Sequence, residues 1–129
     1  MTDLDLATYK NLYLKTARQH INDLKNNIAV LNLNSTDKKV IYEVFRLFHS
    51  FKSQNYFMGF QKTAHLCKVF EKFFQEINEG KKIYNPGMSN IIFDGIRKLE
   101  NSLNAIDENN TEVDLVQDII NLQISLGQL

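Results

Sequence analysis

The sequence has little of what a disulfide scaffold or a β-rich fold requires. Its 129 residues contain one cysteine, one proline, five glycines and no tryptophan. The single Cys67 cannot close an internal disulfide, and its place in an apolar helical pattern predicts a small core residue rather than a reactive thiol. So few prolines and glycines leave few breaks along the chain, which favours long helices. We therefore expect an all-α fold.

The sequence also lacks net charge. Lys plus Arg and Asp plus Glu each number 15, so no bulk positive charge favours nucleic acid or an anionic membrane. A DNA- or RNA-binding helical domain, which needs a basic stripe, is disfavoured for the same reason. No apolar run approaches the ~20 residues that span a bilayer, and no signal-peptide pattern is present. We expect a cytoplasmic protein without membrane insertion.

Five segments carry apolar residues at alternating steps of three and four, the pattern of amphipathic helices. The expected helices run from Leu4 to Leu33, from about Asp37 to Tyr56, from about Phe60 to Glu79, from Asn85–Pro86 to about Ile106, and from about Leu115 onward. The expected core residues are Leu6, Tyr9, Tyr13, Ala17, Ile21, Leu24, Ile28 and Leu31; Ile41, Val44, Phe45, Phe48 and Phe51; Ala64, Cys67, Phe70, Phe74 and Ile77; Ile92, Gly95, Ile96, Leu99, Leu103 and Ile106; and Leu115, Val116, Ile119, Ile120 and Leu122. Short connections between them predict antiparallel neighbours.

Turn and capping residues separate these segments. Ser35 or Thr36 is available to cap the second helix, and Gly59 suits a tight reversal where the second pattern breaks. The pair Asn85–Pro86 fits the N-cap and first position of the fourth helix. The stretch Thr111–Asp114 resembles a weak capping box for the last helix.

The second expected helix carries a histidine with a lysine three residues on. A rotation of about 100° per residue places His49 and Lys52 on adjoining positions of one surface, and His49 lies at the margin of that helix's apolar arc. A nucleophile beside a cation suggests phosphoryl chemistry, although the same spacing occurs by chance in many proteins. His20 has no Cys or carboxylate at metal-ligand spacing, so we interpret it as a boundary residue.

Three short motifs follow one another in the middle of the chain: His49-Ser50-Phe51-Lys52, Gly59-Phe60 and Leu66-Cys67-Lys68-Val69-Phe70-Glu71. Together they resemble the histidine phosphotransfer (HPt) family, most closely the N-terminal phosphotransfer domain of chemotaxis histidine kinases. That family's pattern is H-S-x-K-G-G-x-G-x-x-G-F followed by L-x-H-x-x-E, and the spacing agrees without a gap. The resemblance implies that residues 1–129 form a single domain, an up-down antiparallel bundle of about five helices in which the middle four make the core.

The resemblance also implies roles for the site residues. His49 would be the phosphoacceptor, phosphorylated at Nε2, and Glu71 would accept a hydrogen bond from Nδ1–H and so orient the ring. Lys52 would offset the negative charge of the phosphoryl oxygens. Lys68, which stands where the family has a second histidine, could do the same. His65 lies three residues before that position and receives no role.

A phosphocarrier of two-component signalling is the function that the resemblance implies. It would accept a phosphoryl group from a histidine kinase and pass it to the aspartate of a response-regulator receiver domain. The sequence has no P-loop, no kinase glycine loop and no evident carboxylate cluster for Mg²⁺. We therefore expect no ATP binding, no cofactor and no metal in this domain, and a carrier rather than a stand-alone enzyme, either free-standing or the front end of a larger kinase.

Three positions depart from the family pattern. Ser53 and Gln54 replace two glycines, and Tyr56 replaces a small residue. Ser53 lies one turn from His49 and is small enough to leave it accessible, whereas Tyr56 lies a turn further along the same surface. Both are candidate partner-docking residues, with Tyr56 either an exposed anchor or packed on Phe60. The alternative function is a degenerate helical adaptor or kinase-inhibitor module that binds signalling partners without being phosphorylated.

Overall fold

The computed structural model describes residues 3–127, and all regular structure in that range is helical. The elements are α1 (Asp3–Leu33), α2 (Lys38–Met58), α3 (Gln61–Asn78), the short 3₁₀ helix η1 (Pro86–Met88), α4 (Ser89–Asn109) and α5 (Val116–Gly127). The all-α prediction is confirmed. None of the helices within this range is long and apolar enough to cross a membrane.

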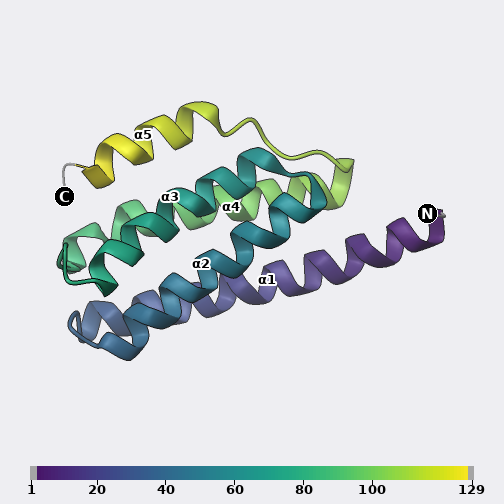
Figure 1. Ribbon diagram of the computed structural model, residues 1–129. Coiled ribbons are helices and arrows are strands. Elements are labelled where there is room, and N and C mark those ends of the chain that lie inside the picture. The colour runs from purple at the N-terminus through teal and green to yellow at the C-terminus, as the bar shows by residue number, and fades with distance from the viewer. Residues whose placement is uncertain (1–2, 128–129) are drawn as a thin grey trace.

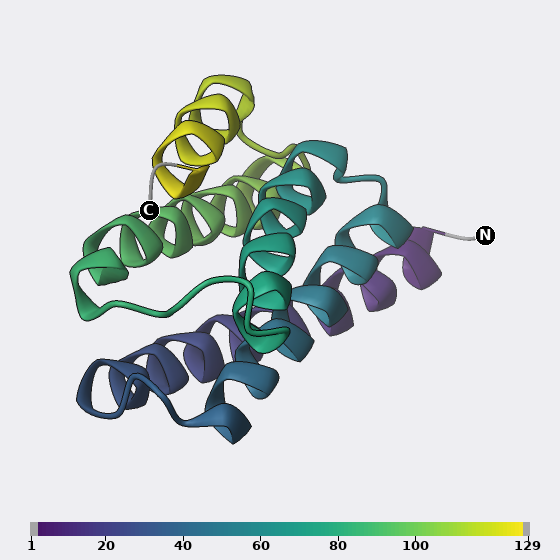
Figure 2. The same cartoon turned by 60° about the vertical axis from the view of Figure 1, so that its left-hand side comes forward.

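Helices α1 to α4 form an antiparallel bundle in which each helix packs on the next and α4 returns to α1 (Figures 1 and 2). Helix α5 lies outside this ring, along α3 and α4. The predicted up-down bundle of five helices with a four-helix core is therefore confirmed. The core helices are the first four rather than the middle four, because α5 has only one face in contact with the bundle.

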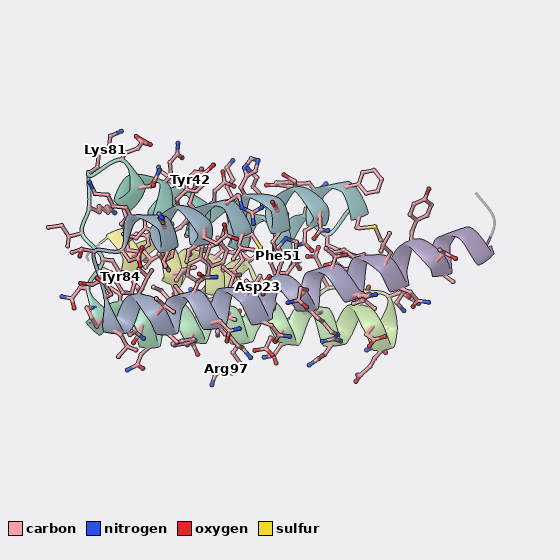
Figure 3. The ribbon with its side chains drawn as sticks, turned by 90° about the horizontal axis from the view of Figure 1, so that it is seen from below. Asp23, Tyr42, Phe51, Lys81, Tyr84 and Arg97 are labelled. Atoms are coloured by element: carbon pink, nitrogen blue, oxygen red, sulfur yellow. The ribbon has the colours of Figure 1, made fainter. Side chains whose placement is uncertain are left out.

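Most of the expected core residues are buried. Tyr9 is 47% exposed because the first turns of α1 extend past the other helices (Figure 3). Phe45 is half-buried at the edge of the core. Val116 and Ile120 are exposed, since they lie on the outer face of α5. The side chain of Leu6 lies outside the described ones.

The second helix begins one residue later and ends two residues later than expected. Asp37 is its N-cap, and the carboxylate accepts hydrogen bonds from the amides of Lys39 and Val40 at 3.1 and 3.2 Å. Ser35 and Thr36 were the wrong candidates, because Asp37 is the residue whose extended backbone (φ −69°, ψ 101°) directs its side chain at the first free amides.

Gly59 ends α2 in the left-handed conformation, with φ 85°. Its N–H donates to the carbonyl of Tyr56 at 3.1 Å, and a residue with a Cβ would be strained there. Phe57 and Met58 are still helical, so the break in the pattern falls later than predicted. The reversal at Gly59 is tight and places α3 directly against α2.

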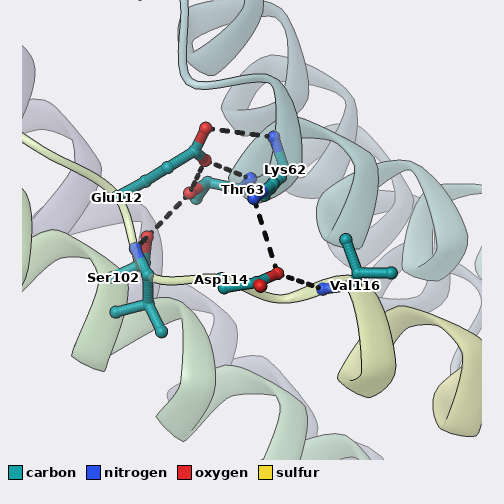
Figure 4. Close-up of polar contacts among 7 residues, drawn as sticks. Lys62, Thr63, Ser102, Glu112, Asp114 and Val116 are labelled. Atoms are coloured by element: carbon teal, nitrogen blue, oxygen red, sulfur yellow. Dashed lines mark hydrogen bonds and ion pairs between the residues drawn. The ribbon is translucent and has the colours of Figure 1, made fainter.

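The stretch Thr111–Asp114 does not form the predicted capping box, although Asp114 accepts a hydrogen bond from the amide of Val116, the first residue of α5, at 3.2 Å (Figure 4). The glutamate of this stretch caps a different helix. Glu112 accepts hydrogen bonds from the amides of Lys62 and Thr63 at 3.3 and 2.7 Å, and from the Thr63 hydroxyl at 2.7 Å. Phe60, the N-cap residue of α3, has no side-chain cap, so the α4–α5 loop supplies the acceptor. The fourth helix also differs, because Asn85–Pro86 opens η1, which leads into α4.

Candidate functional site

His49 lies on the outer surface of α2, beside α3. Its neighbours Phe48 and Phe51 are fully buried, and Phe48 stacks on Phe70 of α3 with ring centroids 4.8 Å apart. Because these rings fix how α2 is turned against α3, His49 points away from the core. The His49 side chain is 55% exposed.

A carboxylate from α3 holds one nitrogen of the ring. Nδ1 of His49 lies 3.3 Å from Oε1 of Glu71, at the long end of hydrogen-bond distances. A carboxylate can only accept, so this contact favours the proton on Nδ1 and leaves the lone pair on Nε2. Within the described part of the chain, Nε2 makes no hydrogen bond. The ring therefore presents a free nucleophilic nitrogen at the surface.

The other oxygen of the same carboxylate binds a lysine. Nζ of Lys52 lies 2.8 Å from Oε2 of Glu71, and the two side chains are only 19% and 14% exposed. Glu71 is thus shared between a histidine and a lysine one turn apart on α2. The structure brings together three of the four residues predicted to act on the phosphoryl group: His49, Lys52 and Glu71.

The fourth, Lys68, is not brought to the histidine. It is exposed on α3 and makes no hydrogen bond or ion pair with any residue in the described range. Lys68 lies three positions before Glu71 in the helix, which places the two side chains about 60° apart around α3. Lys68 has no bond to His49 in this structure, and its action on the phosphoryl group stays a prediction. His65 is likewise exposed and unbonded within that range.

The two candidate docking residues lie on α2 beyond His49. The Ser53 hydroxyl donates to the His49 carbonyl at 3.1 Å, within the helix. Tyr56 is 45% exposed. The ring of Phe60 packs on Tyr13, with centroids 5.4 Å apart. Whether Tyr56 is an anchor or covers the helix end stays a prediction.

Two other reactive side chains near the site are structural. Cys67 is fully buried, and burial together with the negative charge of Glu71 raises the pKa of its thiol well above the usual value. His20 is half-buried, stacks on Phe51 and donates from Nδ1 to the carbonyl of Thr16 at 2.9 Å. Burial lowers its pKa. Among the residues described, no group of three or more His, Cys, Asp or Glu side chains could hold a metal ion.

The family of this chain follows from comparison with known proteins. The Hpt domain profile matches residues 8–109. The chain belongs to the Hpt domain family. It is similar to the chemotaxis protein CheA of Bacillus subtilis (strain 168), with 22% identity over 103 residues, 80% of this chain and 15% of that protein. The chain spans 15–16% of the length of the curated relatives it matches.

Two solved structures share the fold of this Hpt domain. One is the solution structure of the histidine phosphotransfer domain of CheA, with a TM-score of 0.85 and 20% identity, covering 99% of this chain and 92% of that one. The other is the phosphorylated P1 domain of CheA3 in complex with CheY6 from R. sphaeroides, with a TM-score of 0.84 and 13% identity, covering 94% of this chain and 97% of that one.

Sequence reasoning missed an apolar groove on the α1 side of α2 in this Hpt domain. The groove measures about 460 Å³ and carries no charged side chain; it is lined by Tyr9, Leu12, Tyr13, Thr16, Ser53, Gln54, Phe57 and Met58. Leu12 and Phe57 are 60% and 82% exposed. Both are large apolar residues that do not belong to the expected core residues of their helices. An apolar residue outside the buried face was the signal that the sequence offered for this groove.

Proposed function

We propose that this Hpt domain carries a phosphoryl group on Nε2 of His49, taken from a histidine kinase and passed to the aspartate of a response-regulator receiver domain. The supporting observation is the contact between Nδ1 of His49 and Glu71, which leaves Nε2 free on an exposed ring. Neither His20, which is tied to a backbone carbonyl, nor His65, which has no orienting partner within the described residues, offers this arrangement.

Loading forms one P–N bond and breaks one P–O bond. The Nε2 lone pair attacks the γ-phosphorus of ATP held by the kinase, the bond to the bridging oxygen breaks, and ADP leaves. Nδ1 keeps its proton, so the ring becomes positively charged, and Glu71 stabilises that charge. In the second step an aspartate oxygen attacks the phosphorus, the P–N bond breaks, and its electron pair returns to Nε2.

Lys52 has a supporting role in this proposal. Its ammonium group, 2.8 Å from Glu71, lies one helical turn from His49. A cation there lowers the energy of the added phosphoryl charge and keeps Glu71 oriented toward the ring. The relatives fit such a carrier, since they are chemotaxis proteins and one structural neighbour was solved in complex with CheY6. A carrier loaded from ATP would work in the cytoplasm.

The test is chemical and needs no cognate kinase. Phosphoramidate donates its phosphoryl group to a nucleophilic imidazole and releases ammonia. We expect the wild-type domain to gain one phosphoryl group that is labile in acid and stable in alkali, and His49→Gln to gain none. His65→Gln is the matched control, because His65 is also exposed on the α2–α3 hairpin and should leave labelling unchanged. Labelling that persists in His49→Gln would reject the proposal.

The adaptor function remains a second candidate because Tyr56 places a large exposed side chain where the family has a small one. An adaptor would bind its signalling partner equally well with and without His49. Two results together would support the adaptor function. His49→Gln would bind a receiver with wild-type affinity, and the wild type would not be labelled by any histidine kinase of the source organism, including any kinase region of the same protein.

A further inference from the structure

Most lysine and arginine side chains of this domain lie in ion pairs, including those on α4 and on the loop after α3. Five lysine side chains are exposed and make no ion pair or hydrogen bond with a residue that the structure describes: Lys15, Lys38, Lys39, Lys68 and Lys72. Of these, Lys68 and Lys72 lie on α3, the helix that carries Glu71. They lie four residues apart, so they share one face of the helix. We call these two residues the α3 ridge.

The ridge lies on the helix that contacts His49. Glu71 lies between Lys68 and Lys72 in the sequence, and its carboxylate contacts His49 at 3.3 Å and Lys52 at 2.8 Å. Because that carboxylate is already engaged by the two α2 side chains, it is not available to pair with the ridge. The exposed surface of α3, the helix that contacts His49, therefore carries two unpaired positive charges.

The α1 side of α2 carries an uncharged groove near His49. The groove between α1 and α2 begins at Ser53, one turn from His49, and none of its lining residues carries a charge. The domain as a whole has a formal net charge of zero, so the ridge is a local excess of positive charge and not part of a basic surface. A partner that covers His49 and both helices would meet the two cations on α3 and the neutral groove on the α1 side of α2.

We propose that Lys68 and Lys72 form an electrostatic docking site for the receiver domain. This proposal rests on the function proposed above. A receiver presents an acceptor aspartate next to carboxylates that hold a divalent cation, so its reacting surface is acidic. Cations on one flank of His49 attract that surface and orient it across the phosphoryl group. Lys68 thus acts on the partner rather than on the phosphoryl group.

The experiment compares two variants with equal net charge. Lys68→Glu/Lys72→Glu reverses the ridge, and Lys15→Glu/Lys39→Glu reverses two lysines of α1 and α2 that are also exposed and unpaired within the described range. Each replacement subtracts two charges, so both variants change the net charge from 0 to −4. All proteins are loaded with phosphoramidate and mixed with purified receiver domains of the source organism and Mg²⁺. Rapid quenching then gives the second-order rate constant of transfer.

We expect the ridge variant to transfer at least ~10-fold more slowly than the control variant at about 0.1 M salt, and the difference to shrink at about 1 M salt, where charges are screened within ~3 Å. The milder pair Lys68→Gln/Lys72→Gln should fall between wild type and the reversal. Melting temperatures should agree across all variants, because the altered side chains are solvent-exposed.

Equal transfer rates for the ridge and control variants would overturn the inference. So would slower loading by a kinase with unchanged transfer, since the ridge would then serve the kinase. A failure of the proposed function looks different, because the wild-type domain itself would not be loaded or would not transfer to any receiver.

Discussion

Glu71 is the residue whose replacement tests the site most directly. It orients the His49 ring through Nδ1 and holds Lys52 with its other oxygen. Glu71→Ala removes both contacts, so the ring loses its preferred tautomer and the cation that forms on phosphorylation loses its counter-charge. Losses of this kind are about 10²-fold for positioned acid–base groups. Because the His49 contact is long, at 3.3 Å, we expect a fall in loading rate of about 10- to 100-fold, or ~1.4–2.7 kcal/mol in the activation free energy.

Glu71→Gln separates orientation from charge. The amide oxygen can still accept from Nδ1–H, but the negative charge is gone, so we expect a loss smaller than that of the alanine variant. The measurement is the initial rate of labelling by phosphoramidate, together with ¹⁵N NMR of the imidazole. If Glu71 positions the ring, the fraction of the Nδ1–H tautomer falls in Glu71→Ala and is largely retained in Glu71→Gln.

The control for these variants is Glu76→Gln on the same helix, where the carboxylate pairs with Lys82 at 3.2 Å and does not touch the site. It should load at the wild-type rate. The Glu76–Lys82 pair is partly exposed, so Glu76→Gln should lose no more than about 1 kcal/mol of unfolding free energy. The Glu71–Lys52 pair is more buried, so Glu71→Ala should lose more, and its melting temperature shows whether it is folded. A Glu71→Ala variant that is folded and loads as fast as wild type would refute the reasoning, because the carboxylate would then have no part in activating His49.

Two further predictions concern docking and the core. Tyr56→Ala should leave the melting temperature and the loading rate unchanged, since the side chain is 45% exposed. It should weaken receiver binding, measured by calorimetry, by at least ~1 kcal/mol. Equal affinities of the variant and the wild type would show that Tyr56 is no anchor. Gly95→Ala should cost ~1–3 kcal/mol in urea unfolding, because a Cβ there would overlap the ring of Phe70 on α3. Gly127→Ala, which faces open space, is the control, and equal stability of the two variants would contradict the close α3–α4 approach.

Helix periodicity predicted the fold because each helix of the bundle buries one continuous face. Of the residues expected on those faces, the exceptions lie where a helix lacks a neighbour on one side, as Tyr9 does at the start of α1 and Val116 and Ile120 do on α5. A single sequence carries no information on where a neighbouring helix stops. The exposed aromatic and aliphatic residues at these places therefore looked the same as buried ones.

Caps were predicted less well than helices, because a cap can come from a distant part of the chain. Glu112 satisfies amides of α3 that are about fifty residues away in sequence, through contacts spanning 49 and 50 positions. The local pattern instead suggested that the stretch Thr111–Asp114 would begin α5. Nothing in the residues near Gln61 signals that α3 is capped from the α4–α5 loop.

The residues of the site also differ in how far they could be predicted from nearby sequence. The proximity of His49 and Lys52 follows from their spacing within one helix. Glu71 lies 22 residues from His49 on another helix, so its place depended on the predicted helical hairpin, which allowed Glu71 and Lys68 to approach His49, and on the resemblance. The same resemblance suggested Lys68 for the phosphoryl group. Lys68 is exposed and makes no bond to a described residue, so its action on the phosphoryl group stays a prediction.

The departures from the family pattern have a physical consequence of their own. Ser53, Gln54 and Tyr56 all lie on the last turns of α2, after the residues that make the His49–Glu71–Lys52 contacts. Ser53 and Gln54 line the groove, and Tyr56 is exposed beside it. The two glycines of the pattern would leave α2 more flexible there, whereas non-glycine residues stabilise the helix by about 0.5–1 kcal/mol each. The three departures therefore change the surface that a partner meets and leave the His49–Glu71–Lys52 contacts in place. Under the proposed function, we expect Ser53, Gln54 and Tyr56 to affect the choice of receiver rather than the phosphorylation of His49.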